Sequence, residues 1–138
     1  MSSTIEMSLR LAGNLPPTDK LTYLLGVAPS QIFRKGDRIS PKRSQPIDVC
    51  LLDLVKFDSD ISPSESQQQM LVAAKILDNL APAINCLDRS ECQADLYIST
   101  VREDDQGGLS LPPALVAAAA AGNLSIQVSI LVMFDEDD

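Results

Sequence analysis

The chain of 138 residues contains no histidine and no tryptophan, and only 4% of its residues are aromatic. The absence of histidine excludes Ser-His-Asp and Cys-His catalysis, histidine general-base chemistry and nearly all zinc, copper and haem sites. No glycine-rich phosphate loop of either common spacing occurs in the sequence. These absences exclude most familiar enzyme classes, and we expect the protein to need no cofactor.

The sequence shows neither of the patterns that direct a chain to a membrane. Its first residues lack the basic and apolar regions of a secretion signal. No apolar run approaches the roughly 20 residues that span a bilayer. We therefore expect no contact with a membrane.

Three cysteines are present, which is an odd number and does not favour a disulfide framework. Cys50 lies in an apolar stretch, where a free thiol behaves as a small hydrophobic side chain. We expect a cytoplasmic protein in which Cys50 is buried and unreactive. Cys86 and Cys92 are expected to stay unpaired in a reducing compartment.

The remaining composition is typical of one globular domain, with 45% hydrophobic and 22% charged residues. At this length a chain buries enough surface to form a core without disulfides or metals. We expect a single α/β domain over residues 1–138, with short disordered ends at about 1–4 and 135–138.

Apolar and polar residues alternate in five segments, as they do in β-strands. In the first, Ile5, Met7, Leu9 and Leu11 share one face. Residues 38–46, which include two prolines, are predicted to form a loop. The strands are predicted at about residues 5–11, 31–35, 47–57, 94–98 and 126–134.

In the segment 47–57, one face of a long strand is indicated by Ile47, Val49, Leu51, Val55 and Phe57. The leucines at 52 and 54 indicate partial cover on the other face. Asp53 interrupts this apolar pattern. A buried carboxylate there would be a functional candidate, because desolvation would raise its pKa. The other interpretation is a bulge or strand end that turns Asp53 to solvent.

Three helices are predicted, at about residues 17–25, from 63 onward, and 112–121. Gly26 and Gly122 are placed to end the first and the third. Ser62, Pro63 and Glu65 form a helix start in which the serine caps the first turn. Pro82 is expected to kink or break the middle helix. The alanine-rich third helix permits close approach to a sheet. The core stripe of the middle helix is predicted to be Met70, Ala73, Leu77, Leu80, Ile84 and Leu87.

The predicted order is β-α-β-β-α-β-α-β. It favours an α+β fold, namely a ferredoxin-like two-layer sandwich (βαββαβ plus an added αβ) with helices on one face of a mixed four- to five-stranded sheet. The alternative is two βαβ units joined by a long helix.

The last segment has no charge or proline between residues 124 and 134. An edge strand of this kind invites pairing, so we expect it to be central in the sheet or covered in a homodimer.

Two parts of the chain resemble a known family. They are the run Leu24-Leu25-Gly26, Pro29 and Phe33-Arg34-Lys35-Gly36-Asp37, and the ending from Leu109-Ser110-Leu111-Pro112-Pro113 through Gly122 to the last strand. From about residue 9 to 132 the chain is similar to a widespread bacterial family of small domains, the domain-of-unknown-function family 4279. The resemblance implies the fold and a bacterial origin, and it implies no activity.

Charge is distributed unevenly along the chain. Residues 1–46 hold seven Lys and Arg against three Asp and Glu, and residues 47–138 hold four against sixteen. A solvated basic loop is the plainest interpretation of the first part. Binding of a small anionic ligand or an acidic protein is the functional alternative. The pI of about 4.4 and the few aromatic residues disfavour nucleic acid. The candidate binding residues are Arg34, Lys35, Arg38, Lys42, Arg43 and Asp53.

In the predicted topology the acidic residues gather at one edge of the sheet, and Arg34, Lys35 and Arg38 lie at the far edge. Oxygen ligands suit calcium or magnesium, but the acids lack the spacing of a calcium loop, so we expect no metal site. The acids in question are Asp58, Asp60, Glu103, Asp104, Asp105, Asp135, Glu136, Asp137 and Asp138.

These observations favour a non-catalytic binding or protein-interaction module whose partner is another protein or a second copy of the chain. The alternative is a carboxylate-based, metal-dependent hydrolase-like or ligand-processing enzyme. A cavity lined by Asp53 and other acids would favour the enzyme, and an exposed apolar sheet edge would favour the module.

Overall fold

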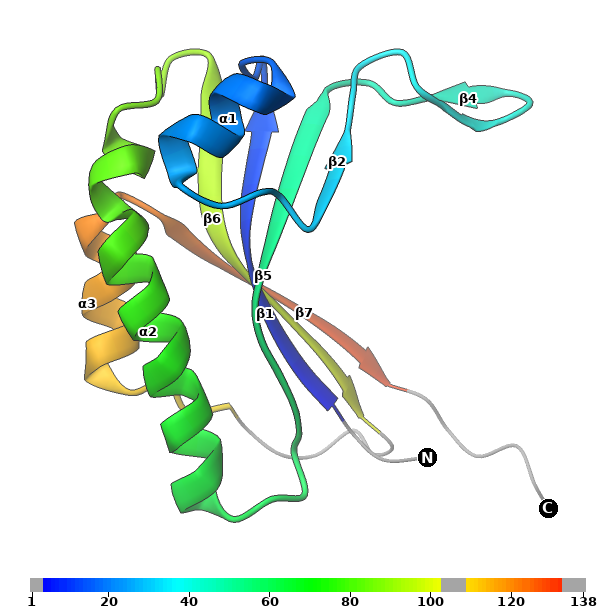
Figure 1. Ribbon diagram of the computed structural model, residues 1–138. Helices are drawn as coiled ribbons and strands as arrows, with labels where there is room; N and C mark the ends of the chain where they lie inside the picture. Colours follow the sequence, from blue (N-terminus) through cyan, green and yellow to red (C-terminus); the bar gives the residue numbers. More distant parts are fainter. Residues whose placement is uncertain (1–3, 103–108, 133–138) are drawn as a thin grey trace, which may run out of the picture.

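The computed structural model describes residues 4–102 and 109–132. Figure 1 shows helices on one side of a twisted sheet and a thin hairpin that extends from the other side. The elements are β1 (Thr4–Gly13), α1 (Thr18–Leu25), β2 (Gln31–Phe33), β3 (Arg38–Ser40), β4 (Arg43–Ser44), β5 (Asp48–Asp58), α2 (Pro63–Asn85), β6 (Cys92–Arg102), α3 (Pro113–Ala121) and β7 (Ser125–Val132).

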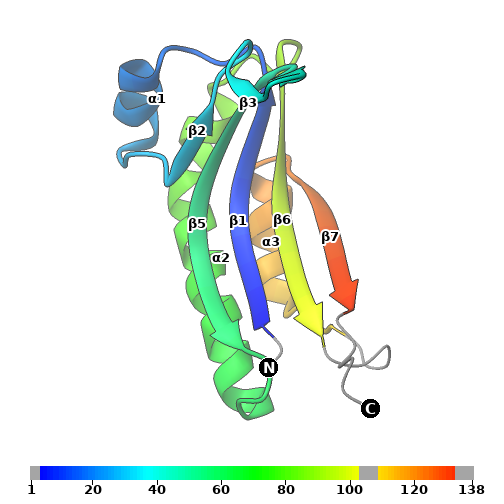
Figure 2. The ribbon, with the colours of Figure 1, turned by 90° about the vertical axis from the view of Figure 1, so that its right-hand side faces the viewer.

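Five strands form one mixed sheet in the order β2-β5-β1-β6-β7 (Figure 2). β1 lies in the middle and is antiparallel to both β5 and β6, whereas β6 and β7 are parallel. The α+β class and the mixed five-stranded sheet agree with the sequence prediction. The strand order alone does not establish the ferredoxin-like topology, which stays a prediction.

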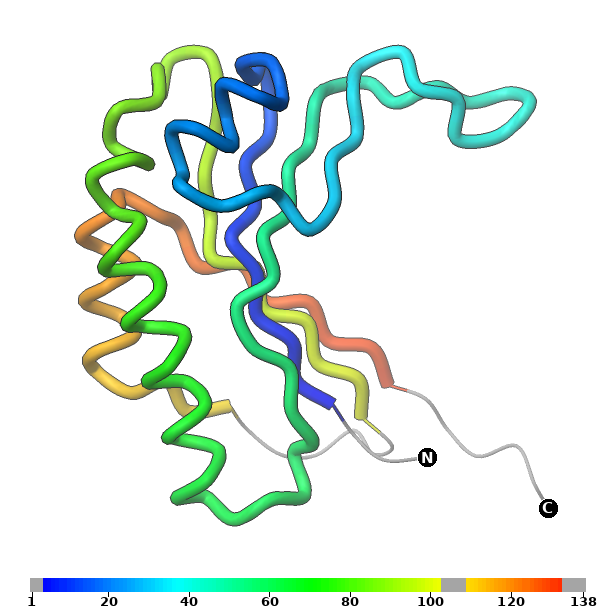
Figure 3. The backbone as a smooth tube through the Cα atoms, in the orientation of Figure 1, coloured from blue at the N-terminus to red at the C-terminus, as the bar shows by residue number. Residues whose placement is uncertain are grey.

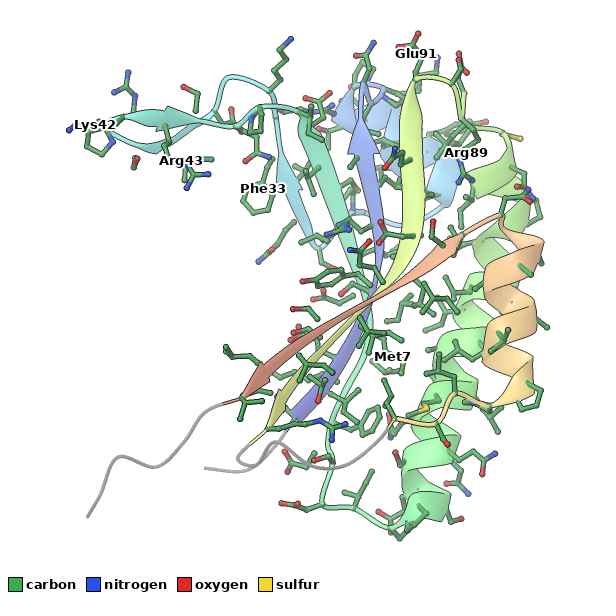
Figure 4. The ribbon with its side chains drawn as sticks, turned by 180° about the vertical axis from the view of Figure 1, so that it is seen from behind. Met7, Phe33, Lys42, Arg43, Arg89 and Glu91 are labelled. Atoms are coloured by element: carbon green, nitrogen blue, oxygen red, sulfur yellow. The ribbon has the colours of Figure 1, made fainter. Side chains whose placement is uncertain are left out.

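The core lies between the helices and one face of this sheet. Met7, Leu9 and Leu11 of β1 are almost fully buried, and Figure 4 shows Met7 on the side of the helices. Leu77 and Ile84 of α2 cover them from the helical layer and are themselves fully buried. Burying one such side chain contributes about 1.5–3 kcal/mol, so this aliphatic layer is the main source of stability.

Local chemistry places α2 where the sequence predicts it. The Ser62 hydroxyl accepts a hydrogen bond from the Glu65 amide at 3.1 Å, and Pro63 occupies the first helical position. All six residues of the predicted stripe are buried. The helix continues through Pro82 to Asn85, so the proline does not end it. Proline has no backbone N–H and therefore removes one helical hydrogen bond. Because Pro82 lies in the last turn, only a short stretch of helix follows this gap.

The prediction of a loop at residues 38–46 is wrong in part. β3 and β4 pair antiparallel there as a separate two-stranded sheet. Gly36 has φ +94°, and its amide bonds to the Gln45 carbonyl at 2.9 Å. Pro41 lies in the turn of the hairpin and Pro46 lies beyond it, so neither proline interrupts the pairing. Figure 3 shows that this hairpin leaves the body of the protein.

The predicted faces of β5 require a correction. Cys50, Leu52 and Leu54 are buried against the helices, whereas Val49 and Leu51 are half-buried on the open face. The register shifts so that Met7 pairs with Val55 and Ser8 with Asp53, which leaves Leu54 as the extra residue of a β-bulge. Beyond the bulge the alternation is reversed, and Phe57 is therefore buried.

The central position considered for the last strand is also wrong, because β7 is the edge of the sheet. α3 packs mainly against α2 and makes little contact with β7. The small side chains of Ala118 and Ala119, both buried, are compatible with this close packing of the two helices.

The predicted disordered ends lie outside the described residues, except Thr4, which belongs to β1. The acids at 103–105 and 135–138 also lie outside them. The predicted separation of charge can be checked for two residues. Asp58 lies at the end of β5, whereas Arg34 follows β2, which runs antiparallel to the start of β5. These two residues lie at opposite ends of the sheet, as predicted.

Candidate functional site

Arg34 is a predicted binding residue, but its guanidinium bonds to other residues of the same chain. Its guanidinium donates to the Pro16 carbonyl at 2.7 Å and the Thr18 hydroxyl at 3.1 Å. It also forms an ion pair with Asp48 at 3.3 Å. These contacts tie the segment between β1 and α1 to the first turn after β2. Arg34 is therefore a structural residue, and most of its donors are unavailable to a ligand.

Asp48 completes this connection from the start of β5. One carboxylate oxygen accepts from the Lys35 amide at 2.8 Å, and the other accepts from the Leu15 amide at 3.1 Å. The Lys35 amide lowers the pKa of Asp48 most; partial burial works in the opposite direction, and the Leu15 amide and the Arg34 guanidinium lower it further. Asp48 thus stays ionised and holds three segments together.

The other four predicted cations lie on the projecting hairpin. We call residues 35–44 the basic arm. Lys35, Arg38, Lys42 and Arg43 are exposed, and among the described residues none of them forms an ion pair with a carboxylate. Arg38 donates only to the Pro41 carbonyl, at 3.5 Å. Figure 4 shows the Lys42 and Arg43 side chains at the far end of the arm. Their charges are free to meet an outside partner.

Apolar side chains accompany these cations. Ile39 on β3 is 51% exposed, and Phe33 at the end of β2 is 41% exposed. The arm and the adjacent Phe33 therefore offer both positive charge and apolar contact area, including the arginine and aromatic side chains that are enriched at protein interfaces.

Asp53 lies on the open face of the sheet, beside the bulge, and is exposed. Its carboxylate accepts from the Ser8 hydroxyl at 3.4 Å. Asp53 thus faces solvent, but regular alternation with Leu52, and not the bulge at Leu54, places it on the open face. A wide hollow of about 370 Å³ lies above it, and its lining includes Glu6, Arg10 and Tyr97. Glu6 and Asp53 are the two carboxylates among the residues that line this hollow.

Sequence reasoning missed one cluster on the same face. The Arg10 guanidinium forms an ion pair with Asp95 at 3.0 Å and lies over the Tyr97 ring, 4.5 Å from its centroid. Arg10 and Asp95 face each other across β1 and β6. Alternation placed each on the polar face of its strand, but only the register brings them together. Because Asp95 neutralises Arg10, this cluster is a weaker anion site than the basic arm.

Neither a metal site nor a spanning helix is found in the part of the chain that the structure describes. Within residues 4–102 and 109–132, no three Cys, Asp or Glu side chains lie close enough to hold a metal ion. Over the same ranges, no helix has the length and apolar character to cross a membrane.

The three cysteines should label at very different rates. Cys50 and Cys92 are buried, Cys86 is exposed, and all three are free thiols. Burial raises the pKa of Cys50 and of Cys92, which lowers the fraction of reactive thiolate at neutral pH. Titration of the folded protein with a thiol reagent should show one fast thiol, lost in Cys86→Ser, and two slow ones. Fast labelling that remains in Cys86→Ser would contradict the burial of the other two.

Comparison with known proteins gives one match. A family model described as "Domain of unknown function (DUF4279)" matches residues 3–133. No curated protein and no solved structure matches the chain. The resemblance expected from the sequence is confirmed, and the match covers all of the described elements.

Proposed function

Since the chain belongs to the family Domain of unknown function (DUF4279), whose description assigns no activity, we propose its function from its surface. We propose that it is a non-catalytic protein-interaction module whose basic arm binds an acidic segment of a partner protein. The observation that carries this proposal is the set of four exposed cations on a projecting hairpin, without carboxylate partners among the described residues.

Electrostatics supports an acidic partner. The whole chain has a net charge of −8, yet the first 46 residues have an excess of four positive charges. A cationic arm on an acidic body attracts an anionic segment at the arm and repels it elsewhere, which gives orientation to the encounter. A protein partner fits better than nucleic acid, because the body would repel a long polyanion and because Ile39 on the arm and Phe33 beside it offer apolar contacts.

The enzyme alternative has less support. Glu6 and Asp53 line the hollow on the open face, but no cluster of metal ligands accompanies them in the described ranges. Without histidine, general acid-base catalysis in this hollow would depend on Glu6, Asp53 or Tyr97, which are part of its lining. Asp53 is exposed, whereas such groups work best in an enclosed site that excludes water.

We infer two further properties of the protein, its location and its architecture. We infer a cytoplasmic protein, because buried free thiols at Cys50 and Cys92 are stable in a reducing compartment. We also infer one domain with a ferredoxin-like core. In support, β1 and β2 run parallel on either side of β5, and β5 and β6 run parallel on either side of β1.

Reversing two charges on the arm should weaken binding of an acidic probe. We expect Lys42→Glu/Arg43→Glu to weaken binding of a poly-glutamate peptide by about tenfold or more at low salt, because two attractive charges become repulsive. Fluorescence anisotropy with the labelled peptide measures the effect. Added salt should weaken wild-type binding as well.

The control variant changes the net charge of the protein by the same amount, at positions outside the arm. Lys56 on β5 and Lys75 on α2 are exposed, so Lys56→Glu/Lys75→Glu should leave peptide binding nearly unchanged. Equal loss in both double variants would mean that only net charge matters and would overturn the proposal. Tighter binding of single-stranded poly-uridine than of the peptide would assign the arm to nucleic acid instead.

A further inference from the structure

The edge strand β7 lacks the features that keep strand edges from pairing. It has eight residues, pairs with β6 along its whole length, and is last in the sheet order. Its sequence, SIQVSILV, contains no charge and no proline. Exposed edges in soluble proteins are usually interrupted by lysine, proline or a bulge, because free backbone N–H and C=O groups bind a further strand. No register shift interrupts β7.

The opposite edge of the same sheet is protected. β2 has only three residues and is followed at once by Arg34 and Lys35. Such a short edge offers few backbone groups, and the adjacent cations oppose pairing with another copy. The two edges therefore differ in kind, and of these two described strands β7 is the one suited to strand addition.

Side chains on β7 are apolar and uncovered. Ile126, Val128 and Ile130, which share the face toward the helices, are 37%, 45% and 59% exposed, and Leu131 on the other face is 56% exposed. Figure 2 shows β7 at the margin of the sheet, outside the layer formed by α2 and α3. Apolar area of this kind in a continuous strip indicates a contact surface.

We propose that a second copy of this chain covers β7, with the two β7 strands antiparallel around a two-fold axis and the two sheets joined into one. The inference does not depend on the basic arm. A second copy fits because the strand is complementary to itself. Every residue on its helix-facing side is apolar, and no charge on either face would meet its own like across the axis.

Symmetry restricts the register of this pairing. A two-fold axis perpendicular to the joined sheet keeps the helix-facing sides together, so even-numbered residues pair with even-numbered ones. Each possible register then has one residue opposite its own copy. Pairing over the most residues of 125–132 places that residue at Val128 or Ser129. With Val128 at the axis, Ile126 pairs with Ile130 of the second copy.

The expected dimer is reversible. An edge of eight residues is about 26 Å long and about 10 Å deep, a footprint of roughly 260 Å². Stable specific complexes bury about 800 Å² per partner, so pairing through this edge should depend on protein concentration.

Cysteine scanning tests both the dimer and its register. In a Cys86→Ser background, single cysteines are placed in turn at positions 125 to 132 and the protein is oxidised at high concentration. Directly opposed residues in antiparallel strands have Cα atoms about 4.5–5.5 Å apart, within the range of a disulfide. We expect covalent dimer to peak at position 128 or 129, several-fold above positions 125 and 132. Equal crosslinking at all positions, or none at any, would overturn the proposal.

Sedimentation velocity over a wide range of concentration provides the second measurement. Wild-type protein should shift from monomer toward dimer, and Val128→Lys should weaken the dimer by about tenfold or more. The control is Val72→Lys on α2, where the replaced valine is 50% exposed against 45% for Val128. The control should associate as the wild type does. A monomer at every concentration, or equal effects of the two lysines, would contradict self-pairing.

Discussion

Gly13→Ala should destabilise the protein by about 3 kcal/mol or more. Gly13 ends β1 with φ +132°, a conformation that side-chain-bearing residues rarely adopt. A Cβ there would lie 2.5 Å from the Glu91 carbonyl oxygen and 2.9 Å from the Cys92 Cα, both backbone atoms. The same carbonyl accepts the Asn14 amide at 3.0 Å. Urea unfolding followed by circular dichroism measures the loss.

Gly36→Ala is the matched control for that experiment. Gly36 also has positive φ, at +94°, but a Cβ there would meet nothing within 4 Å. This variant should lose only the conformational contribution, about 1 kcal/mol. The difference between the two variants isolates the steric contact between β1 and the start of β6. Equal losses would mean that this contact does not limit the approach of the strands.

Arg34→Ala should destabilise the protein by about 2–3 kcal/mol, because hydrogen bonds to charged groups contribute most when both partners are partly buried. The change removes the donors for the Pro16 carbonyl and the Thr18 hydroxyl and leaves Asp48 without its cation. Arg43→Ala, at an exposed position of the arm, should change the free energy of unfolding by less than about 0.5 kcal/mol. If the two variants are equally stable, Arg34 does not hold the β1–α1 segment in place.

The Asp48 contribution should disappear in acid. Because the folded state lowers the pKa of Asp48 below its ordinary value of 3.8, the carboxylate stabilises the fold fully above that pH. Its contribution is lost as pH falls through the lower pKa of the folded state. Asp48→Asn should therefore be less stable than wild type at neutral pH, and the difference should shrink below about pH 3.8. A difference that is constant down to acid unfolding would contradict this linkage.

Local patterns account for most of the elements. The α2 start at Ser62 and Pro63, and the left-handed Gly26 at the end of α1, arise from contacts within a few residues. Alternation identified the core face of β1, because both of its neighbours keep a regular register over most of its length. The β3–β4 hairpin was missed because two prolines in a short polar segment are typical of a loop, although neither lies within a paired strand.

In the candidate site, too, some features were predictable from local sequence and others were not. Exposure of Lys35, Arg38, Lys42 and Arg43 was predictable from a polar segment rich in charge. The internal role of Arg34 was not, since its partner Asp48 is 14 residues away and its other acceptors lie on the segment before α1. The bulge at Leu54 reverses the faces of β5, and alternation alone does not show where such a shift occurs.

The sequence by itself determined the helices, the strand periodicities, the aliphatic core and the absence of histidine chemistry, because these depend on residue type and short-range spacing. Only the tertiary structure decided which residues are free to bind. It paired Arg34 with Asp48, joined Arg10 to Asp95 across 85 residues of chain, and left β7 at the edge of the sheet. Each of these outcomes depends on strand order and register, which arise when distant segments compete for the same face and the same backbone partners.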